Sequence, residues 1–308
     1  MSNNLLGIRE LDLDQIETLL AIAADFKVRI IEGRPVPKIT DKVVGMLFFE
    51  DSTRTRVSFE QAAHYLGLKT ANFAAGASSM SKGETLKDTI LTLRYERLDG
   101  LVIRHRMSGA PNLAARFFAG PVLNAGDGMH EHPTQALGDA LTILERKEKI
   151  EGLKVAIVGD VEHSRVARSN AWLLSKLGAS VNFVGPRTLM PPNSSLLPGR
   201  VYHDLEAGIE GADVIICLRL QRERMAEGLL SSSGEYAAMY QINQRNLAWA
   251  APECLVMHPG PINRGIEVDD FTADGEQSAI TAQIENGIFV RMASLYWVFG
   301  GTVAEVMA

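Results

Sequence analysis

The order of its segments constrains this sequence most: short apolar, β-branched runs alternate with stretches of helical spacing. In the first half we expect strands at 43–49, 70–73, 100–104 and 121–125, and helices at 12–32, 54–66 and 84–97. After an expected helix at 133–149 the order restarts, with strands at 153–160, 179–185, 200–204, 212–218 and 254–258, and helices at 164–178 and 276–299. Strands that alternate with helices need crossover connections, which make a sheet parallel and cover both of its faces.

The restart predicts an α/β protein built from two doubly wound parallel-sheet (Rossmann-like) domains joined by interdomain helices. The length of 308 residues fits about two domains of roughly 150 residues each. Two of the expected helices carry apolar stripes at helical spacing. The stripes consist of Leu13, Ile16, Leu19, Leu20, Ala23 and Phe26 in the first helix, and of Ile280, Ile284, Ile288, Met292 and Leu295 in the last.

Composition excludes several classes of protein. The 31 Lys plus Arg are outnumbered by 37 Asp plus Glu, and the net charge of −6 argues against nucleic-acid and membrane-surface binding, which need clustered positive charge. No apolar run is long enough to span a membrane, and we expect no signal peptide. The two cysteines, Cys217 and Cys254, cannot form a disulfide framework or a four-thiolate zinc site, which favours a reducing cytoplasm.

Ligands of open parallel sheets bind beyond the carboxyl ends of the strands, so the polar turns after strands are the first places to inspect. The turn after 43–49 supplies Ser52, Thr53, Arg54 and Thr55 as a helix begins. Helix-start amides, hydroxyls and a guanidinium fork together suit a phosphate. The alternative is a simple helix cap with a solvated arginine. This run of consecutive polar donors exceeds what a cap requires, and we favour anion binding.

Three further segments carry candidate groups. The loop GASSMSKGETLKDT offers Ser78 and Lys82, which could close over an anion or could belong to an ordinary solvated loop. Arg104 ends a strand, while His132 and Gln135 stand where a helix begins. Arg and neutral His could polarise a carbonyl oxygen, and Gln135 could accept from an NH2 group. His130 and His132 raise the question of a metal, but no third ligand stands at a zinc-like spacing.

Taken together, these motifs resemble the carbamoyltransferase family. The resemblance rests on STRTR followed by SFE, SKGET, VIRH and HPTQAL, in this order and at these intervals. The HPGPINRG stretch at 258–265 and RLQRER at 219–224 are similar to the catalytic chain of the aspartate branch of that family. The match runs from about residue 5 to 300. It implies transfer of a carbamoyl group from carbamoyl phosphate to the α-amine of aspartate, as in pyrimidine biosynthesis.

The resemblance implies a carbamoyl-phosphate domain at 1–132, with a C-terminal helix at about 285–308 packing back on it, and an aspartate domain at 150–284. Ser52, Thr53, Arg54 and Thr55 would hold the phosphate. Thr55, Arg104 and His132 would face the carbonyl oxygen. Gln135, with the backbone around Gly260 and Pro261, would bind the carbamoyl NH2. We therefore predict catalytic roles for Arg54, Thr55, Lys82, Arg104, His132 and Gln135.

The same resemblance places aspartate on Lys82, Arg165, Arg219 and Gln221, with Arg168 a weaker candidate. Two separated arginines suit a dicarboxylate, although each could instead pair with nearby Glu162 or Glu223. Ser78 and Lys82 would reach into a neighbouring subunit's site, so a homotrimer with shared sites is expected. No metal or other cofactor is required. Regulatory chains or dihydroorotase, which accompany some family members, stay open as further partners.

Three other functions compete with this prediction. Ornithine as acceptor is disfavoured because HPGP and the Arg219–Gln221 segment would oppose a cationic amine. A nicotinamide dehydrogenase is disfavoured because the turn after 153–160 lacks G-x-G-x-x-G, having bulky residues after Gly159. A non-catalytic scaffold would be expected to lose the phosphate-binding residues, all of which are present here.

Overall fold

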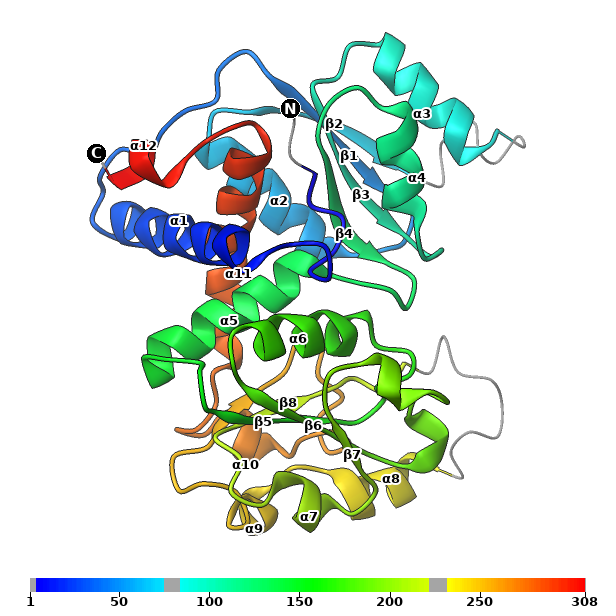
Figure 1. The fold of residues 1–308 in the computed structure, drawn as a ribbon, viewed down its shortest axis with the longest axis vertical. Coiled ribbons are helices and arrows are strands. Elements are labelled where there is room, and N and C mark those ends of the chain that lie inside the picture. The colour runs from blue at the N-terminus through cyan, green and yellow to red at the C-terminus, as the bar shows by residue number, and fades with distance from the viewer. Residues whose placement is uncertain (1–3, 75–83, 222–231, 308) are drawn as a thin grey trace. The chain divides into compact units, whose positions relative to one another are not determined.

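The computed structural model describes residues 4–74, 84–221 and 232–307 (Figure 1). The chain divides into two compact units. Unit 1 comprises Met1–Leu141 and Asn286–Ala308, and unit 2 comprises Thr142–Glu285. Two helices, α5 (Pro133–Lys147) and α11 (Ile280–Val298), each contribute residues to both units.

Unit 1 is built on a four-stranded parallel sheet. Its strands are β1 (Val43–Phe48), β2 (Lys69–Ala74), β3 (Gly100–His105) and β4 (Val122–Asp127), in the order β2-β1-β3-β4. The helices that lie wholly in this unit are α1 (Leu13–Ile31), α2 (Thr53–Tyr65), α3 (Leu86–Tyr95), α4 (Ala110–Phe117) and α12 (Val303–Met307). The order reverses between β1 and β3, and ligands of doubly wound sheets bind beyond the strand ends at such a point.

Local sequence explains why these elements start where they do. Asp12 and Gln15 form a reciprocal capping box that fixes the first turn of α1. Gly109 adopts the left-handed conformation, with φ of 83°, and Pro111 then stands in the first turn of α4. The β-branched and apolar residues of the strands meet α3 and α4 in one buried cluster that includes Leu47 and Ile103.

Unit 2 contains a five-stranded parallel sheet. Its strands are β5 (Lys154–Val158), β6 (Ser180–Val184), β7 (Arg200–Tyr202), β8 (Val214–Cys217) and β9 (Leu255–Met257), in the order β7-β6-β5-β8-β9. The helices wholly in this unit are α6 (Arg165–Lys176), α7 (Leu205–Ile209), α8 (Ser233–Tyr240), α9 (Gln244–Leu247) and α10 (Asp270–Ala273), with 3-10 turns at Arg187–Leu189 and Ser194–Leu196. Here the order reverses between β5 and β8.

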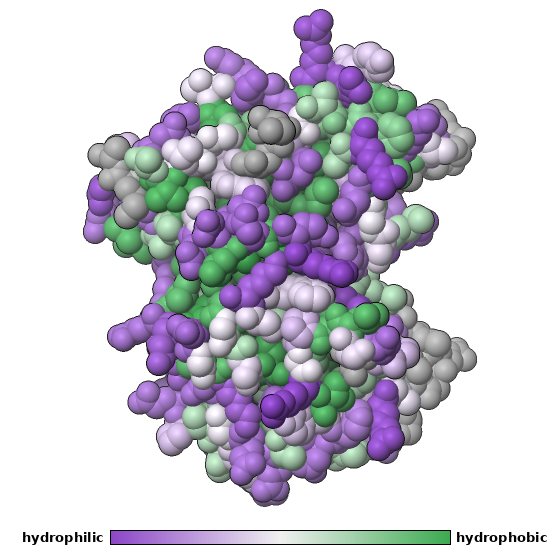
Figure 2. Space-filling view, in the orientation of Figure 1, coloured by the Kyte–Doolittle hydropathy of each residue, from purple (hydrophilic) through white to green (hydrophobic). Residues whose placement is uncertain are grey.

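These two sheets confirm the predicted fold class of two doubly wound parallel α/β domains. The apolar runs of the sequence are buried in the strands, and hydrophilic residues cover much of the face drawn in Figure 2. Over the residues that the structure describes, no helix combines the length and the apolarity needed to cross a membrane.

Candidate active site

Ser52 directly precedes α2 but does not cap it. The side chains of Asp12, Thr85 and Ser164 each accept a hydrogen bond from an amide of the helix that follows, whereas the Ser52 side chain makes no such bond. The alternative in which this serine only caps α2 is therefore wrong for Ser52. A helix start without a side-chain cap favours an anion as the partner of its first-turn amides. Of the next three predicted residues, Thr53 and Arg54 are exposed and Thr55 is buried.

Arg104 occupies the end of β3 and is only 9% exposed. Its Nη2 donates to Glu50 Oε1 at 2.8 Å, and its Nη1 donates to the carbonyl of Ala125 at 3.2 Å. The backbone amide of Phe49 donates to the Arg104 carbonyl at 2.8 Å, which joins the ends of β1 and β3. Glu50, which stands two residues before Ser52, thus holds Arg104 at the point where the strand order reverses.

His132 and Gln135 mark the beginning of α5. His132 is 4% exposed, and its carbonyl accepts from the Gln135 amide at 3.0 Å. The side-chain Nε2 of Gln135 donates to Asp139 Oδ1 at 2.9 Å, one turn further along the helix. Since this bond uses the nitrogen, the side-chain oxygen of Gln135 is the end that can accept from an NH2 group.

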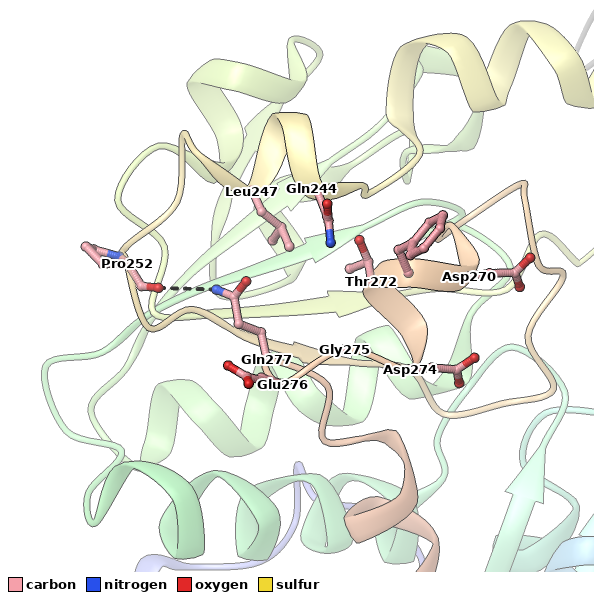
Figure 3. A pocket seen from close by; sticks show the side chains of 10 residues that line it. Gln244, Leu247, Pro252, Asp270, Thr272, Asp274, Gly275, Glu276 and Gln277 are labelled. Atoms are coloured by element: carbon pink, nitrogen blue, oxygen red, sulfur yellow. Dashed lines mark hydrogen bonds between the residues drawn. The ribbon is translucent and has the colours of Figure 1, made fainter.

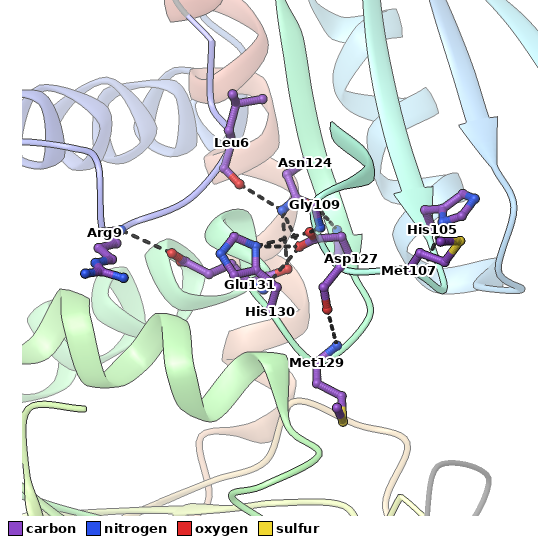
Figure 4. A network of polar contacts seen from close by, with 12 residues as sticks. Leu6, Arg9, His105, Met107, Gly109, Asn124, Asp127, Met129, His130 and Glu131 are labelled. Carbon is purple, nitrogen blue, oxygen red and sulfur yellow. Dashed lines mark hydrogen bonds and ion pairs between the residues drawn. The ribbon is translucent and has the colours of Figure 1, made fainter. Parts of the chain in front are cut away.

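A network of polar groups includes His130 and Glu131, the two residues before His132 in the chain (Figure 4). At its centre is Asp127, whose carboxylate accepts from the amides of Gly109 at 2.6 Å and Glu131 at 3.1 Å. His130 Nδ1 lies 3.1 Å from Asp127 Oδ2, and this hydrogen bond raises the pKa of His130. Burial, followed by the charge of Arg106, lowers the pKa of the neighbouring His105. None of these acids was predicted from sequence.

Of the residues predicted for aspartate, Arg165, Arg219 and Gln221 follow β5 and β8, the two strands at which the order of unit 2 reverses. Arg165 is the first residue of α6 and is 5% exposed, and Ser164 caps the helix by accepting from the Ala167 amide at 3.1 Å. Arg168, the weaker candidate, donates to the carbonyl of Glu162 at 3.2 Å and lies 3.5 Å from its carboxylate. The expected pairing of an arginine with Glu162 therefore applies to Arg168.

Arg219 and Gln221 follow β8 in a segment that two buried acids hold by its backbone. The amide of Leu220, between them, donates to Glu267 Oε1 at 2.9 Å, and the amide of Gln221 donates to Asp160 Oδ2 at 3.4 Å. Burial raises the pKa of both carboxyls. Asp160 also binds the His163 ring at 2.8 Å and thereby links the turn after β5 to the segment after β8.

Gly260 and Pro261 lie in the segment that follows β9, and the peptide bond between them is cis. The Gly260 amide donates to His258 Nδ1 at 2.8 Å. Further along, Asn263 donates to Glu267 through its side chain at 2.6 Å and through its amide at 2.8 Å. Glu267 therefore binds the segments after β8 and after β9 at once.

The described candidate residues follow the carboxyl ends of the strands in each unit. In unit 1, Ser52–Thr55 follow β1, Arg104 lies in β3, and His132 and Gln135 follow β4. In unit 2, Arg165 follows β5, Arg219 and Gln221 follow β8, and Gly260 and Pro261 follow β9. Ser78 and Lys82 lie outside the described residues. Within the described part of the chain, no three His, Cys, Asp or Glu side chains are grouped closely enough to hold a metal ion.

A hollow of about 770 Å³ lies elsewhere in unit 2, beside α9 and α10 (Figure 3). Gln244, Phe271 and Gln277 are among its lining residues, and none of the predicted site residues lines it. Two further lining residues, Asp270 and Asp274, bind Arg264 at 2.9 and 2.8 Å. Arg264 thus balances one of the two negative charges of these acids. The strand-edge sites remain the candidates for chemistry.

Two α/β units with arginine, hydroxyl and amide groups at the reversal points of their sheets define a class of proteins that bind small anionic ligands at strand ends. Residues 3–145 match the family described as "Aspartate/ornithine carbamoyltransferase, carbamoyl-P binding domain". Residues 151–298 match its "Asp/Orn binding domain". The chain belongs to the aspartate/ornithine carbamoyltransferase family.

Individual relatives agree with this assignment. The aspartate carbamoyltransferase catalytic subunit of Moorella thermoacetica is 51% identical over 97% of both chains. The aspartate transcarbamoylase of Trypanosoma cruzi, solved with carbamoyl phosphate and aspartate, is 32% identical with a TM-score of 0.87 and covers 96% of both chains. The ornithine carbamoyltransferase of Pyrococcus furiosus is 30% identical with a TM-score of 0.85, covering 97% of this chain and 98% of its own.

Proposed function

We propose that this chain transfers the carbamoyl group of carbamoyl phosphate to the α-amine of L-aspartate, giving N-carbamoyl-L-aspartate and phosphate for pyrimidine biosynthesis. The observation that carries the proposal is the uncapped start of α2 next to Arg104, which suits a phosphate with an attached carbonyl group. Relatives named aspartate carbamoyltransferase catalytic subunit, such as the one 51% identical over 97% of this chain, support aspartate as the acceptor.

In unit 1, Ser52, Thr53, Arg54 and Thr55 bind the phosphate at the start of α2. Arg104 and His132, together with Thr55, donate hydrogen bonds to the carbamoyl oxygen. The Gln135 side-chain oxygen accepts from the carbamoyl NH2, because its nitrogen already binds Asp139. The backbone at Gly260 and Pro261 supplies further acceptors for this NH2 group.

In unit 2, Arg165 binds the α-carboxylate of aspartate, and Arg219 with Gln221 binds the side-chain carboxylate. A guanidinium fork matches a carboxylate through two parallel hydrogen bonds, so two such groups select a dicarboxylate. Lys82 contributes to both ligands. Ornithine, whose side chain ends in an ammonium group, would be repelled by the arginine beside β8.

The reaction needs no covalent intermediate with the protein. The uncharged α-amine attacks the carbonyl carbon, the new C–N bond forms, and the C–O bond to phosphate breaks as the tetrahedral intermediate collapses. Donors from Arg104 and His132 stabilise the negative oxygen of that intermediate. The proton of the amine passes to the departing phosphate or to Lys82. The protein's main contributions are orientation of two anions and this stabilisation.

The proposal extends to assembly and location. Ser78 and Lys82 complete the site of a neighbouring subunit, which makes the homotrimer the active form. The two described cysteines, Cys217 and Cys254, are buried and unpaired, which supports residence in the reducing cytoplasm. A separate regulatory chain or a dihydroorotase would bind the trimer without supplying groups to the reaction.

The test is an assay of carbamoyl aspartate formation with mass measured in solution, repeated with nucleotides and with ornithine as acceptor. We expect turnover with aspartate, none with ornithine, and a mass of three chains. Turnover with ornithine but not aspartate would overturn the assigned acceptor.

A further inference from the structure

The N-terminal segment adds an edge to the sheet of unit 1. The Leu5 amide donates to the carbonyl of Val122 at 3.0 Å, and the amide of Asn124 donates to the carbonyl of Leu5 at 2.8 Å. The Asn4 side chain accepts from the Val122 amide at 2.8 Å. The segment thus runs parallel to β4 and is fixed to it before the chain reaches α1.

Beyond this edge, the same segment holds a buried carboxylate. Glu131 is 2% exposed, and its oxygens accept from the amides of Ile8 at 2.7 Å and Arg9 at 3.2 Å (Figure 4). A Cβ added at Gly7 would lie 2.6 Å from Glu131 Oε1, so the backbone packs closely against this acid. A buried carboxylate is costly without such donors, which ties the position of Glu131 to the N-terminal segment.

The backbone of Glu131 is fixed as firmly as its side chain. Its carbonyl accepts from the Asp127 amide at 3.1 Å, and its amide donates to Asp127 Oδ1 at 3.1 Å. His132 is the next residue and the last before α5 begins. Both the side chain and the backbone of Glu131 are therefore fixed. The backbone direction at His132 thus depends on contacts with residues more than 120 positions away in the chain.

We propose that Glu131 is a positioning residue for His132, and that Ile8 and Arg9 support it through the two backbone amides that hold the Glu131 carboxylate. This inference rests on the proposed function, in which His132 donates to the carbamoyl oxygen. A displaced donor misses the oxygen when charge develops on it, while phosphate binding at the start of α2 is unaffected. The effect therefore belongs to turnover and not to affinity for carbamoyl phosphate.

The test compares Glu131→Ala and Glu131→Gln with the unaltered enzyme. We expect kcat to fall roughly 10- to 100-fold in Glu131→Ala, with the KM for carbamoyl phosphate changed less than about threefold. Glu131→Gln keeps the shape of the side chain and one acceptor oxygen. Its kcat should therefore lie between that of Glu131→Ala and that of the unaltered enzyme. Asn4→Ala is the matched control, since it removes a bond of the same segment that does not reach Glu131. It should keep the kcat of the unaltered enzyme.

A second readout does not depend on activity. The His132 ring signals, assigned by comparison with His132→Gln, are followed by NMR over a pH titration. We expect the His132 titration to move in both Glu131 variants and to stay unchanged in Asn4→Ala. An unchanged titration, or an unchanged kcat in a folded Glu131 variant, would overturn the inference. Lack of carbamoyl aspartate formation by the unaltered enzyme would overturn the proposed function instead.

Discussion

Gln135 and Arg104 each bond to a carboxylate within unit 1, at 2.9 and 2.8 Å. In both cases the acid occupies donors on the binding side chain and fixes its orientation before any ligand arrives. A side chain held this way loses less rotamer freedom on binding, so more of the interaction energy is realised in the transition state. Glu50 and Asp139 would therefore orient proposed binding groups, although neither is proposed to touch substrate.

Arg54 is expected to be the residue whose loss harms turnover most in the phosphate turn. Arg54→Ala removes the fork that would bind the phosphate, and we expect kcat/KM for carbamoyl phosphate to fall at least about 100-fold. Arg56→Ala is the control, since Arg56 lies two residues on in the same helix and only approaches Glu60, at 3.9 Å. Steady-state kinetics with circular dichroism measure both variants. Near-normal activity in a folded Arg54→Ala would refute the assigned role.

At the scale of elements, helical spacing and β-branched runs predict the nine strands and the longer helices of the described residues to within a few residues. They miss α4, α7, α8, α9, α10 and α12, which have only four to eight residues each. Such helices span too few turns for an apolar stripe to repeat. The sequence SGAP resembles a turn, yet its Gly109 is the left-handed residue before α4 and its Ala110 and Pro111 begin the helix.

Most residues of the two predicted apolar stripes are covered as predicted, but two of them are exposed. Ile16, Leu19 and Phe26 are buried as predicted, but Leu13 is 44% exposed and Ile284 is 59% exposed. Leu13 is the first residue of α1, where spacing alone cannot tell whether a neighbouring element extends far enough to cover it. Periodicity predicts a face of the helix, whereas burial also depends on the length of what packs against that face.

The segments after β8 and β9 are expected to respond together to a change at Glu267. In Glu267→Gln the new NH2 group faces donors at Leu220 and Asn263, so the loop that carries Arg219 should shift. We expect the KM for aspartate to rise about tenfold, equivalent to about 1.4 kcal/mol. Inorganic phosphate, which binds in unit 1, should keep its Kd.

The matched control for Glu267 is Asp270→Asn, an exposed acid of the same unit that pairs with Arg264. Initial-rate kinetics over a range of aspartate concentrations, together with calorimetric titration of phosphate, measure the two effects. Equal losses in both variants would mean that any acid removed from unit 2 weakens aspartate binding, and would contradict a specific role for Glu267.

At the scale of the whole molecule, the sequence predicts turns that carry candidate binding groups but not which strands are neighbours. The candidate turns follow strands that include β1, β3, β5, β8 and β9. The structure adds that β1 adjoins β3, and that β5 adjoins β8. Strand order depends on packing between distant segments, and a local pattern does not encode it. The buried acids escaped prediction for the same reason, because their partners lie in other loops.

The stability of the molecule should depend on pH through His130. Its pKa is raised by the hydrogen bond to Asp127 and by the charges of Asp127, Glu131 and Glu10. A histidine whose pKa is raised by folding stabilises the folded state fully below its ordinary pKa of 6.5. This stabilisation is lost as the pH rises through the pKa of the folded state. His130→Gln should therefore lose part of the fall in Tm that the unaltered protein shows as the pH rises above about 6.5.

The neighbouring His105 acts in the opposite sense, because burial lowers its pKa and stability is lost as pH falls below 6.5. With His130 removed, acid destabilisation from His105 should remain visible in melting curves. His64→Gln, which changes an exposed histidine at the end of α2, should keep the pH profile of the unaltered protein. A His130→Gln profile identical to that of His64→Gln would contradict the effect.

If the active sites of a trimer are shared between subunits, two inactive variants can restore activity to each other, which a single chain cannot do. If Lys82 completes the site of a neighbouring subunit that supplies Arg54, then Arg54→Ala and Lys82→Ala damage different halves of each site. Co-expression with two different tags and purification over both yields only hybrid trimers. Every hybrid, whichever variant is in excess, contains one site with both residues intact, so about one third of normal activity should return from two inactive parents. Hybrids as inactive as their parents would mean that each chain supplies its own Lys82, and the trimer would then be dispensable for the chemistry.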